Sequence, residues 1–481
     1  MKRFICKEEL GNSLRRWLIW VLVIVIGSGI IAVQGRGGDD HVDDLAPIDL
    51  VDPDEHGAGS DGDNDFGFHG AGLAMDGSRA EDAVGTTSPL QDLLTWPGTL
   101  GTWGLVDEAF DTLAVPDAGH VAWKLAAGDQ RQAIHVVAWK RDSESVQLRS
   151  ELARGRVLGI ESVVAIAERL SRAQHGGGSA IAAVNADFFM GSPVLGQPIG
   201  IHVSDGELIT DPNGRPLVAL FDDGRIWIGD VEFQATVERL VGGKPAADFP
   251  LAAVNRAAVP NGLTLYTPRY DASVSLAHAD STAVVLQALL RPLRAGATHQ
   301  AVVMRHVTGP AEIEIPAQGA VLVGRGQAAE FVHALRPADR LLFHLNFEPA
   351  LTGVQQAVAG SHVLVWNGEA ANLDSNDPLV SARHPRTAIG YNDEVVFLVT
   401  VDGRQPGYAN GMTLPELAEL FLALGADAAL NLDGGGSTTM AIRRSEDHAL
   451  KVVNRPSDGS PRSVANALVL MSVDPLHDPL P

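Results

Sequence analysis

The chain has 481 residues, 45% of them hydrophobic, so most of it can fold around a core larger than that of an average single domain. Its formal net charge of −23 argues against a nucleic-acid partner, because binding a polyanion needs a basic stripe that so acidic a chain lacks. Cys6 is the only cysteine, which excludes a disulfide framework within the chain.

The N-terminal residues have the pattern of a membrane-targeting segment. A short basic segment over residues 1–16 precedes an uncharged, almost wholly apolar run over residues 17–33. This run is at the short end of the roughly 17–25 residues that a spanning helix needs, and Ala32-Val33-Gln34 offers only one of the two small residues of a cleavage site. We therefore expect an uncleaved transmembrane helix, a signal anchor, that leaves the N-terminus in the cytoplasm and the rest of the chain outside it.

Residues 34–97 are rich in glycine and aspartate. Between Asp39 and Asp82, fourteen acidic residues accompany Arg79 as the single basic one, a net charge of −13. A segment of this composition buries too little apolar surface to offset the entropy of ordering, and its charges repel one another. We expect a disordered acidic linker here.

Residues 98–481 contain no comparable linker and no internal repeat, so we expect one large domain. Residues 161–172 have apolar positions at helical spacing. Short apolar runs bounded by turn residues predict strands over residues 121–125, 134–140, 181–189, 200–203, 217–221, 225–228, 231–237, 282–290, 319–323, 341–345 and 363–366. Many strands and few helices predict an α+β fold with mixed, largely antiparallel sheets, because a doubly wound fold needs a helix after nearly every strand.

The segment from Val401 to Met440 is the most informative part of the chain. Thr413 and Glu416 have the spacing of a capping box, and apolar positions follow at helical spacing up to Gly425, a residue typical of a helix C-terminus. Residues 428–433 are then predicted to form a strand.

Polar residues gather where the strands of this segment end. The strand period of two places Asn431 and Asp433 on one face, and Asp402 follows the preceding strand. The next residues are glycine or carry a hydroxyl: Gly435, Gly436, Ser437 and Thr438. The backbone amides of such a turn can bind phosphate, although the same residues could form a tight hairpin. The segment therefore predicts a site for a phosphorylated or hydroxylated ligand.

Several sequence blocks resemble the phosphodiester glycosidase family. They are VDGRQPGYANGMTLPELA, ALNLDGGGSTTM, HPRTAIG at residues 384–390 and NRPSDGSPRSVANAL at residues 454–468, with looser matches at NADFF (residues 185–189) and GIHVSDGEL (residues 200–208). The resemblance spans roughly residues 121–473. It implies that residues 98–481 form a catalytic domain, a hydrolase acting on sugar-1-phosphodiesters such as those of N-acetylglucosamine. Animal members of the family carry cysteine-rich modules, which this chain lacks. The chain therefore looks like a bacterial member of the cell envelope, whose substrate would be a phosphorylated glycan or exopolysaccharide.

Hydrolysis of a glycosyl phosphodiester needs a carboxylate near the anomeric carbon and donors that bind the phosphate. Asp433 is the leading carboxylate, although an aspartate before glycine can also cap its own turn. Asp402 is the second candidate carboxylate, and because it precedes Gly403 it could likewise cap its own turn. Asn431 is the third catalytic candidate. The expected substrate- and phosphate-binding residues come from the matching blocks: Asn185, Arg386, Thr387, Arg404, Gly435, Gly436, Ser437, Thr438, Arg462 and Asn466.

Three points stay open at the level of sequence. Asp187 departs from the small residue that family members often have there, so we carry no role over to it. No cofactor is required, and no cluster has the spacing of a zinc site, but a calcium or magnesium ion at Asp402 or Asp433 is an alternative. The competing functions are a membrane-tethered glycan-binding protein without catalysis and a phosphodiesterase that cleaves the other P–O bond.

Overall fold

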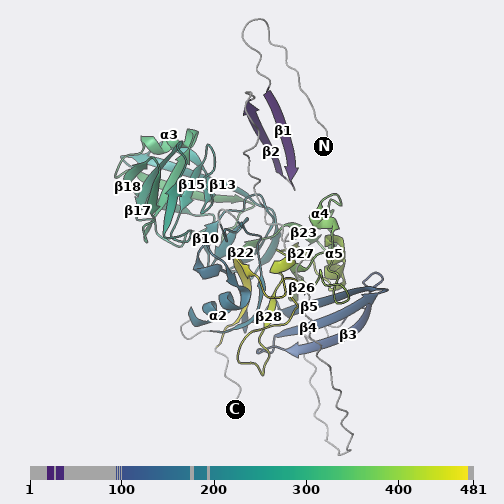
Figure 1. The fold of residues 1–481 in the computed structure, drawn as a ribbon. Helices are drawn as coiled ribbons and strands as arrows, with labels where there is room; N and C mark the ends of the chain where they lie inside the picture. Colours follow the sequence, from purple (N-terminus) through teal and green to yellow (C-terminus); the bar gives the residue numbers. More distant parts are fainter. Residues whose placement is uncertain are drawn as a thin grey trace, which may run out of the picture. The chain divides into compact units, whose positions relative to one another are not determined.

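The computed structural model describes residues 19–26, 29–36, 94, 96, 98, 100–173, 178–191 and 195–474. Contacts divide the chain into a unit over residues 1–49 and a unit over residues 50–481. In the first unit, β1 (Ile19–Ile26) and β2 (Gly29–Arg36) pair antiparallel, and both are drawn in purple in Figure 1.

The predicted anchor falls on this first unit. Where its residues are described they form strands rather than the expected helix. No helix among the described residues has the length and apolar content that crossing a membrane requires. The anchor at residues 17–33 stays a prediction, as do the basic segment over residues 1–16 and the linker over residues 34–97, which lie almost entirely outside the described residues.

Two sheets pack face to face in the second unit. The first has eight strands, in the order β24 (Glu369–Ala370), β23 (His362–Trp366), β27 (Ala428–Asn431), β25 (Arg386–Tyr391), β26 (Val395–Val401), β5 (Gln130–Lys140), β4 (Ala118–Ala127) and β3 (Gly104–Thr112). The second has five, in the order β29 (Lys451–Val452), β28 (Met440–Ile442), β8 (Ala180–Asn185), β31 (Asn466–Ser472) and β6 (Val146–Leu152). All neighbours in both sheets are antiparallel.

A helix covers the outer face of each of these sheets. Helix α5 (Leu414–Ala423) packs on the eight-stranded sheet, and α2 (Val163–Ala173) on the five-stranded one. Because their inner strands are buried on both faces, those strands are nearly continuous apolar runs, such as VVFLVTV in β26. The two faces that meet between the sheets share one apolar cluster.

A third sheet carries an inserted barrel. The sheet order is β10 (Glu207–Thr210), β9 (His202–Ser204), β22 (Val354–Ala359), β11 (Leu217–Phe221) and β12 (Ile226–Gly229). The chain between β12 and β22 forms a closed barrel of β13 (Glu232–Val241), β14 (Lys244–Val254), β15 (Leu263–Tyr266), β20 (Gly319–Arg325), β17 (Ser281–Gln287), β18 (Thr298–Thr308) and β21 (Arg340–Glu348), with α3 (Gln327–Ala334) beside it (Figure 1).

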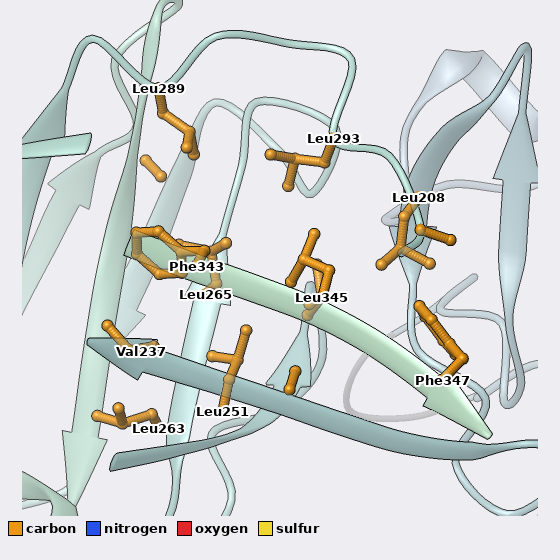
Figure 2. Packing of buried hydrophobic residues seen from close by; sticks show 14 of the residues in the cluster. Leu208, Val237, Leu251, Leu263, Leu265, Leu289, Leu293, Phe343, Leu345 and Phe347 are labelled. Atoms are coloured by element: carbon orange, nitrogen blue, oxygen red, sulfur yellow. The ribbon is translucent and has the colours of Figure 1, made fainter. Parts of the chain in front are cut away.

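Apolar side chains fill the barrel. Figure 2 shows Phe343 and Leu345 of β21 near Leu251 of β14 and Leu265 of β15, and all four are buried. This packing stabilises the insertion by removing apolar surface from water. Shorter elements complete the described part: β7 (Glu161–Ser162) with β30 (Ser463–Val464), β16 (Ser273–Leu276) with β19 (Ala311–Glu314), α4 (Pro378–Ser381) and the 3₁₀ turns η1 (Ala153–Gly155) and η2 (Gly435–Ser437).

The predicted fold class is confirmed, since the described residues form mixed, mostly antiparallel sheets with few helices. The capping box at Thr413 and Glu416 is present, and Gly425 has φ +74° directly after the helix. The strand predicted over residues 282–290 ends earlier, at Gln287. Two strands at the candidate site are also shorter than expected: the run over residues 181–189 ends at Asn185, and that over residues 428–433 ends at Asn431. Both strands end where the polar residues of the candidate site begin.

Candidate functional site

Asp433 lies where the two packed sheets meet. Its backbone N–H donates to the carbonyl oxygen of Ala186 at 2.8 Å, and its own carbonyl oxygen accepts from Asn185 Nδ2 at 2.6 Å. The side chain remains partly exposed, and its Oδ1 accepts from the N–H of Gly434 at 2.9 Å. Burial of the carboxyl group raises the pKa of Asp433 to about 6, against the opposing effect of its hydrogen bond with Ser437. A carboxyl group with a pKa near 6, on a residue that is partly exposed, can act as base, acid or nucleophile.

The glycine turn, residues 434–436, has no room for side chains. A Cβ on Gly434 would lie 2.6 Å from the carbonyl oxygen of Pro385, and one on Gly436 would lie 2.1 Å from Arg462 Nη2. Gly435 has φ +59°, a left-handed conformation that favours glycine. The three glycines therefore bring the backbone against neighbouring loops and the arginine guanidinium groups.

Three basic side chains, which we call the basic rim, stand around this turn: His384, Arg404 and Arg462. All are partly exposed. Arg404 Nη2 lies 3.0 Å from His384 Nδ1, and its Nη1 lies 3.2 Å from where a Cβ on Gly435 would be. Arg462 pairs with Asp458 at 2.7 Å, and its positive charge acts on Asp433. The basic rim and Asp433 together make the accessible, charged part of the site.

Several predicted binding residues are enclosed and support the site from beneath. Asn185 is fully buried, and its Oδ1 accepts from Thr387 Oγ1 at 2.8 Å and from the N–H of Thr439 at 3.1 Å. Ser437 and Thr438 are also buried. These side chains hold the strand ends and the glycine turn in place, and their predicted contacts with substrate stay predictions.

Arg386 is buried as well, at 1% exposure. Its guanidinium group donates to the carbonyl oxygens of Met412 at 2.8 Å, Leu379 at 2.8 Å and Ala382 at 2.7 Å. Burial lowers the pKa of Arg386 to about 10. This geometry favours a structural clamp between loops and gives no support to the predicted contact with phosphate.

Asp402 is 1% exposed, and its carboxylate group accepts hydrogen bonds from other residues of the protein. It accepts from Tyr408 Oη at 3.0 Å, Asn454 Nδ2 at 2.9 Å and the N–H of Arg455 at 2.8 Å. Burial raises the pKa of Asp402, and these hydrogen bonds oppose the shift. Asp402 therefore organises two loops, and Asp433 is the better placed of the two candidate carboxylates.

The remaining catalytic candidate, Asn431, is 1% exposed. Its Nδ2 donates to Ser361 Oγ at 2.8 Å and to the carbonyl oxygen of Leu432 at 2.9 Å, while its buried Oδ1 has no hydrogen-bond partner. Asn431 thus turns toward β23 and steadies the strand end before Asp433.

Asp187 is a carboxylate to which the sequence assigned no role. Its backbone N–H donates to Asn466 Oδ1 at 2.9 Å, and its Oδ2 accepts from the N–H of Gly200 at 2.7 Å. Its Oδ1 is buried without a partner. Burial raises the pKa of Asp187 to about 7, and the negative charge of Asp433 adds to the shift. The two carboxyl groups are therefore close enough to influence each other, as acid and base pairs in active sites do.

Arg215 is the other residue that sequence reasoning missed. It follows Asn213 (φ 52°) and Gly214 (φ 68°), and its N–H donates to the carbonyl oxygen of Pro212 at 3.2 Å, which defines a tight turn. Its positive charge acts on both Asp187 and Asp433. The Asn-Gly pair was a visible turn signal in the sequence, but nothing there placed this turn beside the distant glycine turn.

Within the described residues, no group of three or more His, Cys, Asp or Glu side chains is arranged to hold a metal ion. The calcium or magnesium alternative at Asp402 or Asp433 therefore has no support from the geometry.

Residues 294–471 match the model of a family described as phosphodiester glycosidase. Among curated proteins, a prophage-derived uncharacterized protein of Bacillus subtilis is 36% identical over 96 residues, which cover 20% of this chain and 14% of that relative. The chain thus spans a small part of that relative's length.

Two solved structures, from Synechocystis and Burkholderia pseudomallei, share the fold. A hypothetical protein from Synechocystis aligns with a TM-score of 0.60 at 21% identity, over 74% of this chain and 62% of that one. A putative exported protein from Burkholderia pseudomallei aligns with a TM-score of 0.54 at 22% identity, over 71% of this chain and 74% of that one. The zebrafish N-acetylglucosamine-1-phosphodiester alpha-N-acetylglucosaminidase catalytic domain, auto-inhibited by its pro-peptide, aligns with a TM-score of 0.39 at 15% identity, over 76% of this chain and 88% of that one.

Proposed function

We propose that this chain, whose residues 294–471 match the phosphodiester glycosidase family, is a hydrolase that cleaves the bond between a sugar's anomeric carbon and the phosphate oxygen in glycosyl phosphodiesters. The observation that carries the proposal is the carboxyl group of the partly exposed residue Asp433, with its raised pKa, beside the glycine turn and the basic rim. A carboxylate and guanidinium groups side by side suit a substrate that develops positive charge on the sugar and carries negative charge on the phosphate.

The chemistry needs little beyond these groups. The transition state of glycoside cleavage has oxocarbenium character, which a carboxylate at Asp433 stabilises. A phosphate monoester is a better leaving group than an alcohol, so it needs less protonation, and arginine donors can bind its oxygens. Water adds its hydroxyl group to the anomeric carbon and its proton to the solution or to the released phosphate.

Two features extend the proposal to a cellular role. The apolar run over residues 17–33 and the acidic linker after it would tether an exported catalytic domain outside the membrane. The substrate would then be a phosphorylated glycan of the cell envelope, such as an exopolysaccharide or a conjugate carrying N-acetylglucosamine-1-phosphodiester groups.

Hydrolysis in ¹⁸O-labelled water tests the reaction. The full-length protein is incubated with an N-acetylglucosamine-1-phosphodiester, and the products are analysed by mass spectrometry. Label in the sugar supports glycosidic cleavage. Label in the phosphate contradicts it and identifies a phosphodiesterase, and release of the intact sugar 1-phosphate shows that this enzyme cleaves the other P–O bond. Binding of the substrate without any product identifies a glycan-binding protein instead.

A further inference from the structure

Arg215 stands out because, in the described part of the chain, no residue accepts a hydrogen bond from its guanidinium group. It forms no ion pair and no side-chain hydrogen bond among the described residues, and its Nη1 is buried without a partner. Buried polar groups are almost always hydrogen-bonded, so an unpaired one beside a candidate site indicates a missing ligand or water. We propose that Arg215 binds a phosphate oxygen of the substrate and forms, with the ring of Phe188, an anion subsite next to Asp433.

The backbone holds Arg215 in this position from both sides. Before it, the carbonyl oxygen of Asp211 accepts from Arg256 Nη2, and after it, the carbonyl oxygen of Pro216 accepts from the N–H of Gly360 at 2.8 Å. The guanidinium carbon lies 4.8 Å from the centre of the Phe188 ring. Stacking on an aromatic ring fixes the plane of the guanidinium group and leaves its edge available for hydrogen bonds.

Arg256 shows what a structural arginine looks like in the same region. Its positive charge also acts on Asp187, but it is 6% exposed and all three of its nitrogens donate. Nε binds Asp211 at 2.8 Å, Nη1 binds the carbonyl oxygen of Pro198 at 2.9 Å, and Nη2 binds that of Gly200 at 2.7 Å. The protein therefore occupies four of the five guanidinium N–H groups of Arg256. In the described part of the chain, no residue accepts a hydrogen bond from the guanidinium group of Arg215.

Position and charge favour phosphate as the ligand. The positive charges of Arg215 and of Arg462, which belongs to the basic rim, both lower the pKa of Asp433. Cationic groups from two distant segments of the chain therefore act on the same carboxyl group. A planar fork binds phosphate through two parallel hydrogen bonds. The raised pKa of Asp187 limits the negative charge that would repel the anion. Arg215 also lies outside residues 294–471, so the subsite draws on a part of the chain that the family match does not cover.

The inference rests on the proposed function, and binding of inorganic phosphate tests it separately from turnover. The full-length protein, Arg215→Ala, Arg215→Lys and the control Arg225→Ala are titrated calorimetrically with inorganic phosphate at constant ionic strength. Arg225 is a matched control because it also stacks on a ring, at 3.6 Å from the centre of Phe221, but is exposed and pairs with Asp223.

We expect wild type and Arg225→Ala to bind phosphate alike, Arg215→Ala to bind it about tenfold or more weakly, and Arg215→Lys to fall between them. Equal binding by Arg215→Ala, or no binding by wild type, would overturn the subsite. Phosphate binding that depends on Arg215 in a protein without turnover would support the subsite and refute the proposed hydrolysis. Arg215→Lys retains the charge, so it keeps the test valid if the alanine variant folds poorly.

Discussion

Asn185 and Asp433 are 248 positions apart in the chain, yet Asn185 Nδ2 donates to the carbonyl oxygen of Asp433 at 2.6 Å. This bond ties the end of β8 in one sheet to the segment after β27 in the other, so the position of the candidate carboxylate depends on both sheets. Because Asn185 is fully buried, we expect it to act through Asp433 rather than by contact with substrate.

Asn185→Ala is therefore expected to lower kcat more than it raises KM. It removes the donor to Asp433 and leaves the hydroxyl of Thr387 and the N–H of Thr439 without their acceptor. We expect a loss of about 1–3 kcal/mol in the free energy of unfolding and a fall in kcat of about tenfold or more. Steady-state kinetics with urea unfolding would measure both. A large rise in KM with unchanged kcat would show instead that Asn185 contacts the substrate.

The Arg386→Lys variant tests whether Arg386 holds the loops together or binds the phosphate of the substrate. Lysine cannot reach three carbonyl oxygens at once, so the free energy of unfolding should fall by about 2–4 kcal/mol. The folded fraction should keep kcat/KM near that of wild type. If the variant is as stable as wild type but loses catalytic efficiency more than tenfold, Arg386 is a phosphate ligand, as its place in the family block suggested.

Asp187→Asn should change how stability depends on pH. The pKa of Asp187 is raised from 3.8 to about 7 by burial, so between these values the folded state holds a proton that the unfolded state has lost. This group's contribution to wild-type stability therefore falls as pH rises from about 4 to about 7, and asparagine removes that dependence. The melting temperature of Asp187→Asn relative to wild type should rise between pH 4 and pH 8. A difference that stays constant across this range would show that the carboxyl group is ionised throughout.

The predicted anchor can be tested on cells that express the protein. If residues 17–33 span the membrane with the N-terminus inside, protease added to intact cells should remove the catalytic domain, and the mature N-terminus should still begin near Met1. Immunoblotting with antibodies against each end, followed by N-terminal sequencing, would measure this. Recovery of a soluble form that begins near Gly35 would show a cleaved signal peptide.

The sequence predicted those features that depend on neighbouring residues. The capping box at Thr413, the helix after it and the strand leading to Asn431 rest on local spacing, and the structure contains all of them. The closed barrel depends on pairs such as that of β13 with β21, whose registered residues are about a hundred positions apart, for example Arg239 with Leu341. No local pattern specifies such a pairing, so the barrel was not predicted.

The site residues divide in the same way. Residue type and motif identified Asp433, but a strand period assigns a face and does not say whether that face is open to solvent. The sequence therefore assigned Asn185 and Arg386 to substrate binding and Asp402 to catalysis, and the structure encloses all three. Arg215 and Asp187 approach Asp433 only because separate sheets meet, so their contribution required the tertiary structure.

The most direct test of the account compares Asp433→Asn with Asp402→Asn on a glycosyl phosphodiester, with melting temperatures measured on the same samples. If Asp433 faces the anomeric carbon, Asp433→Asn should keep its fold and its substrate binding and lose about 10²–10⁴ in turnover, the range for a missing acid or base. Asp402→Asn should lower the melting temperature more than Asp433→Asn does, because the Asp402 carboxylate accepts hydrogen bonds from three protein donors. A stable Asp433→Asn protein with full turnover would contradict the account and transfer the carboxylate role to Asp402.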